Sequence, residues 1–516
     1  MPVTRRQFLL RTAALAALGS VAPVARVGAQ QFSDTPFALG IASGYPHEGG
    51  MTLWTRLAPR PLEGGGMPVA PVEVQWEVAA DDGFRTIAAR GKSIASGEWA
   101  HSVHVDVAGL QPARPYWYRF RAGSAVSPVG RTNTAPAPDA RMQRLRVAFA
   151  SCQQYEQGYF SAYRHMARED LDLVVHLGDY IYESSWGRNL VRAHGSDQPL
   201  TLDEYRARHA LYKSDEDLRA AHAAFPWIVT WDDHEVQNDY ANERSQSLDP
   251  PDAFLLRRAA AYQAYYEHMP LPAWARPNGA HMRLHTTVAY GQLATFFVLD
   301  DRQYRSHQVC ARPGRGGSTV VREELCPERV DPALTMLGRQ QEQWLAESFG
   351  RTHGAWNLIA QQTLMAQAAR RPGVGREYWT DGWDGYPRAR ERLLESVVRQ
   401  RVRNPLVLSG DVHMSAIADL KIDFDAAKSP VVATEIAGPS ITSQGPTIAR
   451  VEALRQENPH IKFANGTSRG YATLDITPSR CVARLRTVGT VTQRESEIRT
   501  LTTYAVEDGR PGAHRA

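Results

Sequence analysis

With 516 residues, the chain is longer than one ordinary domain, and we expect at least two. Its hydrophobic fraction of 43% and its 12 Trp, 20 Tyr and 14 Phe exclude a disordered protein and favour a well-packed one of enzyme size. The formal net charge of +4 equals the number of arginines in residues 1–29, which contain no acid, so the remaining chain is neutral and gives no electrostatic case for a nucleic-acid partner.

The first 29 residues have the layout of an export signal. Arg5-Arg6 is followed by Phe8-Leu9 and by an apolar run over Thr12–Ala25, which is shorter than the roughly 20 residues that span a bilayer. Val27-Gly28-Ala29 then offers small residues for cleavage, and the arginine pair resembles the twin-arginine consensus. We expect a twin-arginine signal peptide over 1–29, export by the twin-arginine machinery, a periplasmic or secreted protein, and no transmembrane anchor after cleavage.

Residues 34–133 are predicted to form an N-terminal all-β domain. The segments MTLWTRL, VEVQWEVA, HSVHVDV and PYWYRFRAG alternate apolar and polar residues between turn formers, with almost no helical period. This pattern is typical of a small β-sandwich of the immunoglobulin or fibronectin kind. The polar segment TNTAPAPDARMQ, with two prolines, is the predicted linker to the next domain.

Residues 144–490 are predicted to form an α/β layered domain. Apolar strands such as LRVAFASC, LDLVVHLGD, FPWIVTWDD and NPLVLSGD alternate with helical stretches, including 257–268 and 338–349. Residues 491–516 end in GRPGAHRA, which has turn formers and no apolar period, so we expect a frayed C-terminal tail.

Four cysteines are available for disulfides in an oxidising compartment. Cys310 and Cys326 bracket a loop rich in Gly and Arg, and we expect them to be bridged. Cys152 and Cys481 could also pair, although Cys481 lies in an alternating segment where a buried thiol is the usual interpretation.

Polar and ionisable side chains recur directly after apolar strands, where the carboxyl ends of α/β strands face the ligand crevice. A single Asp in such a place is often only a turn or cap residue, but several strand ends together predict one shared site. Further donors follow in GDYIYE, WDDHEVQND and GDVH. Oxygen and nitrogen donors suit hard cations, and a thiolate also binds iron. The candidate site residues are Cys152, Asp179, Tyr182, Asp232, Asp233, His234, Asn238, Asp411 and His413.

The order of these motifs resembles that of calcineurin-like metallophosphoesterases, whose common forms are GDxxY, GNHE and GHxH. Here DDHE replaces GNHE, GDVH replaces GHxH, and the Cys of ASCQ stands where the first Asp or His is usual. These departures resemble the PhoD-like alkaline phosphatase family, as do FALGIASGYPHEGGMTLWTRLAP, VLDDRQYRS and IAQQTLMA. One mismatch is Asp301, where the family pattern VLDTRQYR has Thr.

The resemblance implies a four-layer αββα metallophosphoesterase sandwich that binds Fe³⁺ and Ca²⁺. A donor set dominated by carboxylates also fits these ions better than zinc. The implied iron ligands are Cys152, Asp179, Tyr182 and His413. Asp179 would bridge to calcium, which would also use Asp233 and Asp411, with Asp232 as a further candidate.

The implied enzyme is a secreted hydrolase, similar to alkaline phosphatase, acting on phosphate monoesters, diesters or both. A metal-bound hydroxide would attack phosphorus directly, without a phosphoenzyme. His234 and Asn238 would contact the phosphoryl group, and His234 would protonate the leaving alkoxide.

Two other functions stay open. The first keeps the site but makes the protein a phosphodiesterase of the kind that acts on phospholipids or teichoic-acid-like polymers. The second is a surface-binding β-sandwich protein with a degenerate hydrolase domain, which the complete set of donors disfavours.

Individual residues also have plainer interpretations. Tyr182 could pack at the crevice wall, as we expect of Tyr180, and His234 could support the site without touching substrate. Gln361 and Gln362 stand near where related enzymes supply a ligand histidine, and either could be a weak donor.

Overall fold

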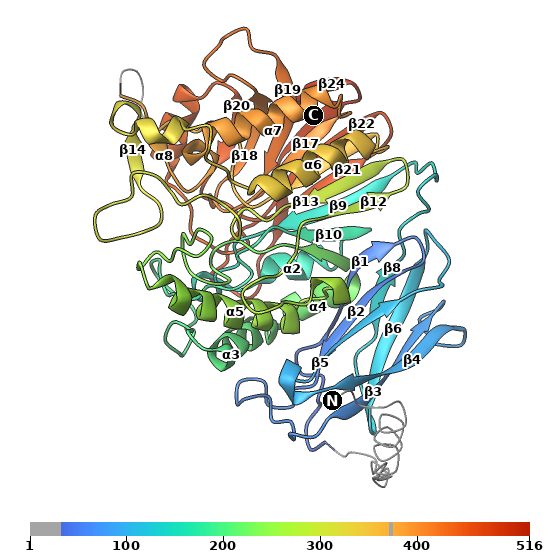
Figure 1. Ribbon diagram of the computed structural model, residues 1–516. Coiled ribbons are helices and arrows are strands. Elements are labelled where there is room, and N and C mark those ends of the chain that lie inside the picture. The colour runs from blue at the N-terminus through green and yellow to red at the C-terminus, as the bar shows by residue number, and fades with distance from the viewer. Residues whose placement is uncertain (1–31, 371–374) are drawn as a thin grey trace, which may run out of the picture.

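The computed structural model describes residues 32–370 and 375–516, so the predicted signal peptide over 1–29 lies outside the described residues. Within the described part of the chain, we find no helix that is both long and apolar enough to cross a bilayer. Two large sheets dominate this part (Figure 1).

The larger sheet has ten strands and draws on both ends of the chain. Its central strands β9, β10, β11 and β1 are parallel, and antiparallel strands extend it on either side. In spatial order it runs β24 (Arg510–Arg515), β23 (Ile498–Glu507), β22 (Arg480–Val488), β21 (Arg469–Ile476), β9 (Leu145–Ala150), β10 (Leu173–His176), β11 (Pro226–Val229), β1 (Ile41–His47), β2 (Gly50–Arg56) and β5 (Ser102–Val107).

The second sheet has seven strands, with parallel pairing from β13 through β15 and β17 to β19. In spatial order it runs β12 (Thr286–Tyr290), β13 (Ala294–Val298), β15 (Trp356–Ala360), β17 (Pro405–Ser409), β19 (Val431–Ala437), β18 (Ser415–Lys421) and β20 (Ile461–Asn465). The strands β13, β15 and β17 are buried throughout, as expected for parallel strands covered on both faces.

Helices cover the outer faces of the two sheets, so the domain has four layers (Figure 1). One core fills the space between the sheets, and a second lies between the seven-stranded sheet and α6 and α7. The helices are α2 (Ser161–Met166), α3 (Leu202–Lys213), α4 (Glu216–Ala224), α5 (Pro251–His268), α6 (Arg339–Arg351), α7 (Pro387–Arg399) and α8 (Ile448–Glu457). The predicted αββα class is confirmed, as are the helices expected over 257–268 and 338–349.

The N-terminal β-rich region packs around its own apolar core. A second, five-stranded sheet faces β1, β2 and β5 across that core. It comprises β4 (Ile87–Ala95), β3 (Val72–Ala79), β6 (Pro115–Ala122), β7 (Ala125–Val126) and β8 (Gly130–Asn133), which pairs with β6. The all-β character expected of this region is confirmed.

The N-terminal sandwich shares a sheet with the rest of the molecule, because β1 pairs in parallel with β11. Gly44 makes this approach possible: a Cβ there would lie 2.6 Å from the carbonyl oxygen of Trp227 and 2.5 Å from that of Pro270. The hydroxyl of Tyr45 also donates a hydrogen bond of 2.7 Å to the carbonyl of Val229. The two regions are therefore joined through backbone pairing as well as through a linker.

The expectation of a frayed C-terminal tail is wrong. Residues Ile498–Glu507 and Arg510–Arg515 form β23 and β24 at the edge of the ten-stranded sheet. The amide of Gly512 donates to Thr434 Oγ1 at 2.9 Å, and Lys462 Nζ donates to the carbonyl of Ala513 at 2.6 Å. An edge strand held by its backbone needs no alternation of apolar residues, which is why GRPGAHRA gave no strand signal.

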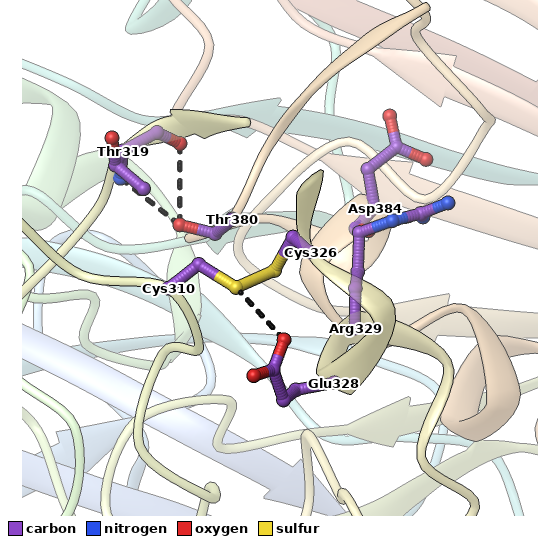
Figure 2. Close-up of a disulfide and its surroundings, with 7 residues drawn as sticks. All are labelled: Cys310, Thr319, Cys326, Glu328, Arg329, Thr380 and Asp384. Carbon is purple, nitrogen blue, oxygen red and sulfur yellow. Dashed lines mark hydrogen bonds between the residues drawn. A yellow bond between two sulfur atoms is a disulfide. The ribbon is translucent and has the colours of Figure 1, made fainter. Parts of the chain in front are cut away.

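The disulfide expected between Cys310 and Cys326 is confirmed (Figure 2). It closes a loop that contains β14 (Val320–Arg322), which pairs with β16 (Glu377–Trp379). Figure 2 shows Thr319 and Thr380 linked beside it by hydrogen bonds. Cys152 and Cys481 are both buried and free, so they do not pair.

Candidate active site

The candidate donors gather where the parallel strands of both sheets end. Asp179 follows β10, and its carboxylate belongs to each of three groups of donor atoms that lie within 4.8 Å of one another. The groups are Cys152, Asp179 and His413; Asp179, Asp232 and Asp411; and Asp179, Asp233 and His234. Residues that follow three other strands, β9, β11 and β17, thus surround the Asp179 carboxylate.

Four residues at these strand ends have a left-handed backbone. The φ angles are 59° at Cys152, 54° at Asp179, 59° at Asp411 and 50° at His413. Such conformations cost on the order of 1–3 kcal/mol each for a residue with a side chain, and they cluster at functional sites. The strained backbone at these turns therefore supports a functional role, in which it sets the direction of the four side chains.

Tyr182 lies between Asp179 and His413. Its hydroxyl donates a 2.7 Å hydrogen bond to Asp179 Oδ2 and lies 3.1 Å from His413 Nε2. The other ring nitrogen of His413, Nδ1, donates to the carbonyl of Gln444 at 3.1 Å, which leaves the Nε2 lone pair free to face the site. Tyr182 therefore does more than pack at the wall, whereas the hydroxyl of Tyr180 is paired with His222 at 2.8 Å in the core.

Burial disfavours ionisation of two site carboxylates and of the site thiol. Burial raises the pKa of Asp232 and of Asp411 well above the ordinary value, although the Arg302 guanidinium acts in the opposite direction. Burial and the neighbouring Asp179 also raise the pKa of the Cys152 thiol. These groups must be ionised to bind a cation, and in these surroundings a nearby cation is what would favour their ionised forms.

Arg302 is the main positive charge that the protein itself supplies. Fully buried, it donates through Nε to Asp232, lies 3.7 Å from Asp233 Oδ2, and lies 2.7 Å from Asp381 Oδ2. Burial would raise the pKa of Asp233, but the Arg302 guanidinium, the charge of His234 and backbone hydrogen bonds together outweigh burial, and the pKa is lowered. The segment VLDDRQYRS contains this arginine, but its sequence pattern did not indicate the role of Arg302.

Glu235 fixes the turns that carry Asp179 and Asp232. Its carboxylate accepts hydrogen bonds from the amides of Tyr180 at 2.7 Å, Asp232 at 2.8 Å and Asp179 at 3.2 Å. Burial, assisted by the charge of Asp179, raises the pKa of Glu235 to about 8. The Glu of DDHE is thus a positioning residue, which the sequence motif contained but did not explain.

His234 is oriented by a second buried carboxylate, Glu183. The Glu183 Oε2 atom lies 2.6 Å from His234 Nδ1, and Oε1 accepts the amide of Asn238 at 2.9 Å. Burial lowers the pKa of His234, but Glu183, Asp233 and Asp179 outweigh it and raise that pKa well above the ordinary value. Glu183 was not among the residues selected from the sequence.

Gln361 and Gln362 are both engaged in hydrogen bonds that join strand ends. Gln362 Nε2 donates to the carbonyl of Trp231 at 2.7 Å, and Gln361 Nε2 donates to Ser409 Oγ at 2.8 Å. At the divergent position, Asp301 is fully buried, and burial raises its pKa to about 7. Neither of its carboxylate oxygens has a hydrogen-bond partner in the described part of the chain.

The donor cluster opens into a cavity of about 810 Å³. Asp179, Asp233, His234, Asn238, Asp411 and His413 line one part of it. The lining continues to β16, to the turn at Trp383–Gly385 and to α8. This volume is within the range of pockets that enclose whole small-molecule ligands, and it exceeds what one phosphoryl group needs.

Comparisons with known proteins agree with this architecture. Residues 147–485 match the model of the PhoD-like phosphatase family, and residues 21–136 match that of the PhoD-like phosphatase N-terminal domain. The chain belongs to the PhoD-like phosphatase family. It is 45% identical to alkaline phosphatase D of Bacillus subtilis (strain 168), over 99% of this chain and 89% of that protein.

A solved structure described as the structure of PhoD superimposes with a TM-score of 0.89. It is 46% identical in sequence, and the match covers 94% of this chain and 93% of the other. Membership of the PhoD-like phosphatase family makes this protein a hydrolase of phosphoric esters, as the sequence predicted.

The donors fit a metal centre on their own geometry. Asp179 Oδ1 and Asp411 Oδ2 are buried and have no hydrogen-bond partner among the described residues. Buried carboxylate oxygens are normally paired, and their clustering with a thiol, a phenol and an imidazole leaves a cation as the natural partner.

Removal of the Arg302 guanidinium tests whether it stabilises the buried carboxylates around it. In metal-free protein, Arg302→Met should lower the free energy of unfolding by about 3–5 kcal/mol, because it leaves three buried carboxylates without their shared cation. Urea unfolding measures the change, with the exposed Arg312→Met as the matched control. Equal stability of the two variants would contradict the assigned role.

Proposed function

We propose that this protein is an exported phosphoesterase that binds iron and calcium at the strand ends described above. The observation that carries the proposal is the convergence of three donor groups on Asp179, one of which contains the thiol of Cys152. The iron ligands are Cys152, Asp179, Tyr182 and His413. The calcium ligands would be Asp179, Asp233 and Asp411, with Asp232 as a further candidate.

The division between the two ions follows donor chemistry. The Cys152 side holds a thiol, a phenol and an imidazole, donors that suit a transition metal such as iron. The Asp411 side holds only carboxylates, which suit a hard cation such as calcium. When bound, such ions would neutralise phosphoryl oxygens and acidify a water molecule.

The protein's own groups supply orientation and a proton. Glu183 holds His234 at Nδ1, so the Nε2–H is free to protonate the departing oxygen of the ester. Asn238 lines the same cavity, and its side-chain amide can donate to a phosphoryl oxygen. Glu235 and the left-handed turns keep the acceptors in place before substrate binds.

A second candidate function, phosphodiester hydrolysis at the same site, is favoured by the cavity. Its volume of about 810 Å³ leaves room for groups on both sides of the phosphorus atom. Parallel assays with p-nitrophenyl phosphate and its bis ester distinguish the two activities. The non-enzymatic β-sandwich alternative is excluded by membership of the phosphatase family.

Tyr182→Phe tests the iron site without relying on activity. Iron bound to a tyrosinate absorbs visible light, so we expect the purified protein to be coloured and the variant to lose the band. Tyr180→Phe is the matched control, because its hydroxyl is paired with His222 in the core and it should keep the colour. Retention of the full band in Tyr182→Phe would refute the assignment of this ligand.

His234→Gln tests the proton donor. Loss of a general acid should lower kcat by about a hundredfold or more for an alkyl ester such as glycerol phosphate, whose alkoxide is a poor leaving group. The loss should be much smaller for p-nitrophenyl phosphate, because nitrophenolate departs without a proton. Equal losses on both substrates would show that His234 acts in another way.

The export proposal rests on the sequence of residues 1–29 and on the metal chemistry. The twin-arginine route carries folded proteins, so iron could be inserted in the cytoplasm before the protein leaves. Replacing both Arg5 and Arg6 with Lys should leave unprocessed precursor inside the cell, whereas Arg11→Lys should be processed normally. Immunoblotting of cell fractions measures where the protein is. Normal secretion of the double variant would contradict this route.

A further inference from the structure

The catalytic cavity has an outer part that the phosphoryl chemistry does not use. Beyond His413 its lining includes Trp379 of β16, Trp383 and the first turns of α8. Two arginines, Arg370 and Arg450, line this part as well. An ester whose phosphorus lies at the donor cluster would therefore place its alcohol part next to apolar rings and positive charge.

Arg450 lies in the first turn of α8 and is exposed to the cavity side. Its backbone amide donates to the N-cap residue Thr447 at 3.4 Å, and the first turn contains no acidic residue. A cation at this end of a helix is opposed by the helix dipole, so the position gains nothing in local stability.

Arg370 comes from the other side of the same cavity. Its guanidinium lies 5.9 Å from the ring centre of Trp379, and the side chain is partly buried. Burial and, next, the positive charge of Arg450 lower the pKa of Arg370 to about 10, against smaller opposing effects of Asp384 and Glu377. The two guanidinium groups are thus close enough to repel each other.

Among the described residues, neither arginine has a carboxylate within ion-pair distance, and residues 371–374 contain no acid. Asp384 also lines the cavity and acts on Arg370, but its carboxylate already has other partners. It lies 2.8 Å from Arg390 Nη1 and accepts the amide of Ala368 at 2.8 Å. Arg370 and Arg450 thus line one cavity wall and repel each other, and neither forms an ion pair with a carboxylate in the described part of the chain. Such a pair of guanidinium groups is suited to bind an anion from outside the protein.

We propose that Arg370 and Arg450 form an anion subsite that binds a second anionic group, such as a phosphate or carboxylate, on the alcohol part of the ester. This inference rests on the proposed function, because it takes the phosphorus atom to lie at the Asp179 cluster. It specifies the substrate class as esters with a charge at each end, separated by a spacer that packs along Trp379 and Trp383.

A homologous series of substrates tests the subsite. The probes are alkane-1,n-diol bisphosphates and the monophosphates of the same diols, which share the leaving alkoxide and differ in the distal charge. With the metal-loaded enzyme, kcat/KM should be higher for the bisphosphate at the spacer length that reaches the arginines. In Arg370→Gln/Arg450→Gln that preference should fall about tenfold, and added salt should weaken it in the wild type.

Arg455→Gln is the matched control, because Arg455 lies on the same helix, is exposed and does not line the cavity. It should keep the wild-type preference. An unchanged preference in the double variant, or no preference at any spacer length, would overturn the subsite while leaving the phosphoesterase intact. A metal-loaded wild type inactive on every monophosphate and bisphosphate, and on bis-p-nitrophenyl phosphate as well, would instead overturn the proposed function, and the subsite with it. Because Arg450 is exposed, Arg450→Gln alone should fold and already show part of the loss.

Discussion

The mutual repulsion of buried carboxylates at the strand ends is the constraint on which the rest of the site depends. Asp179, Asp232 and Asp233 are buried and Asp411 is half-buried beside them, in surroundings where charges interact more strongly than in bulk solvent. Arg302 offsets part of this repulsion, and Glu235 holds the turns through their amides. The repulsion therefore destabilises the metal-free fold, and a bound cation would relieve it, as expected of a preorganised metal site.

Much of the architecture could be predicted from the sequence because it rests on local patterns. Alternating and continuous apolar runs indicated the two kinds of sheet, and the donors that follow LVVHLG and PLVLSG lie together as expected. What could not be predicted depends on contacts between distant segments. The pairing of β1 with β11 leaves no periodic signal, and the edge strand β24 has no apolar face to reveal it.

The site residues divide in the same way, into those found in local sequence motifs and those that depend on contacts with distant segments. Cys152, Asp179, Asp411 and His413 are visible in motifs because each stands at the end of its own strand. Arg302, Glu183 and Asp381 act through pairing with residues elsewhere in the chain, and a buried charge cannot be told from a surface charge by its letter alone. Asp301, where the family pattern has Thr, shows that even the interior near this arginine tolerates another carboxyl group.

The continuous ten-stranded sheet has a consequence for how this enzyme can change during evolution or design. Since β1 supplies the neighbour of β11, the N-terminal β-sandwich is not a detachable accessory module. Deleting it would leave an unpaired strand edge beside the strand that carries Asp232 and Asp233 towards the site, a surface prone to pairing with other chains. Exchange of this region between relatives is therefore restricted to replacements that restore the same parallel partner, with a glycine where the two backbones meet.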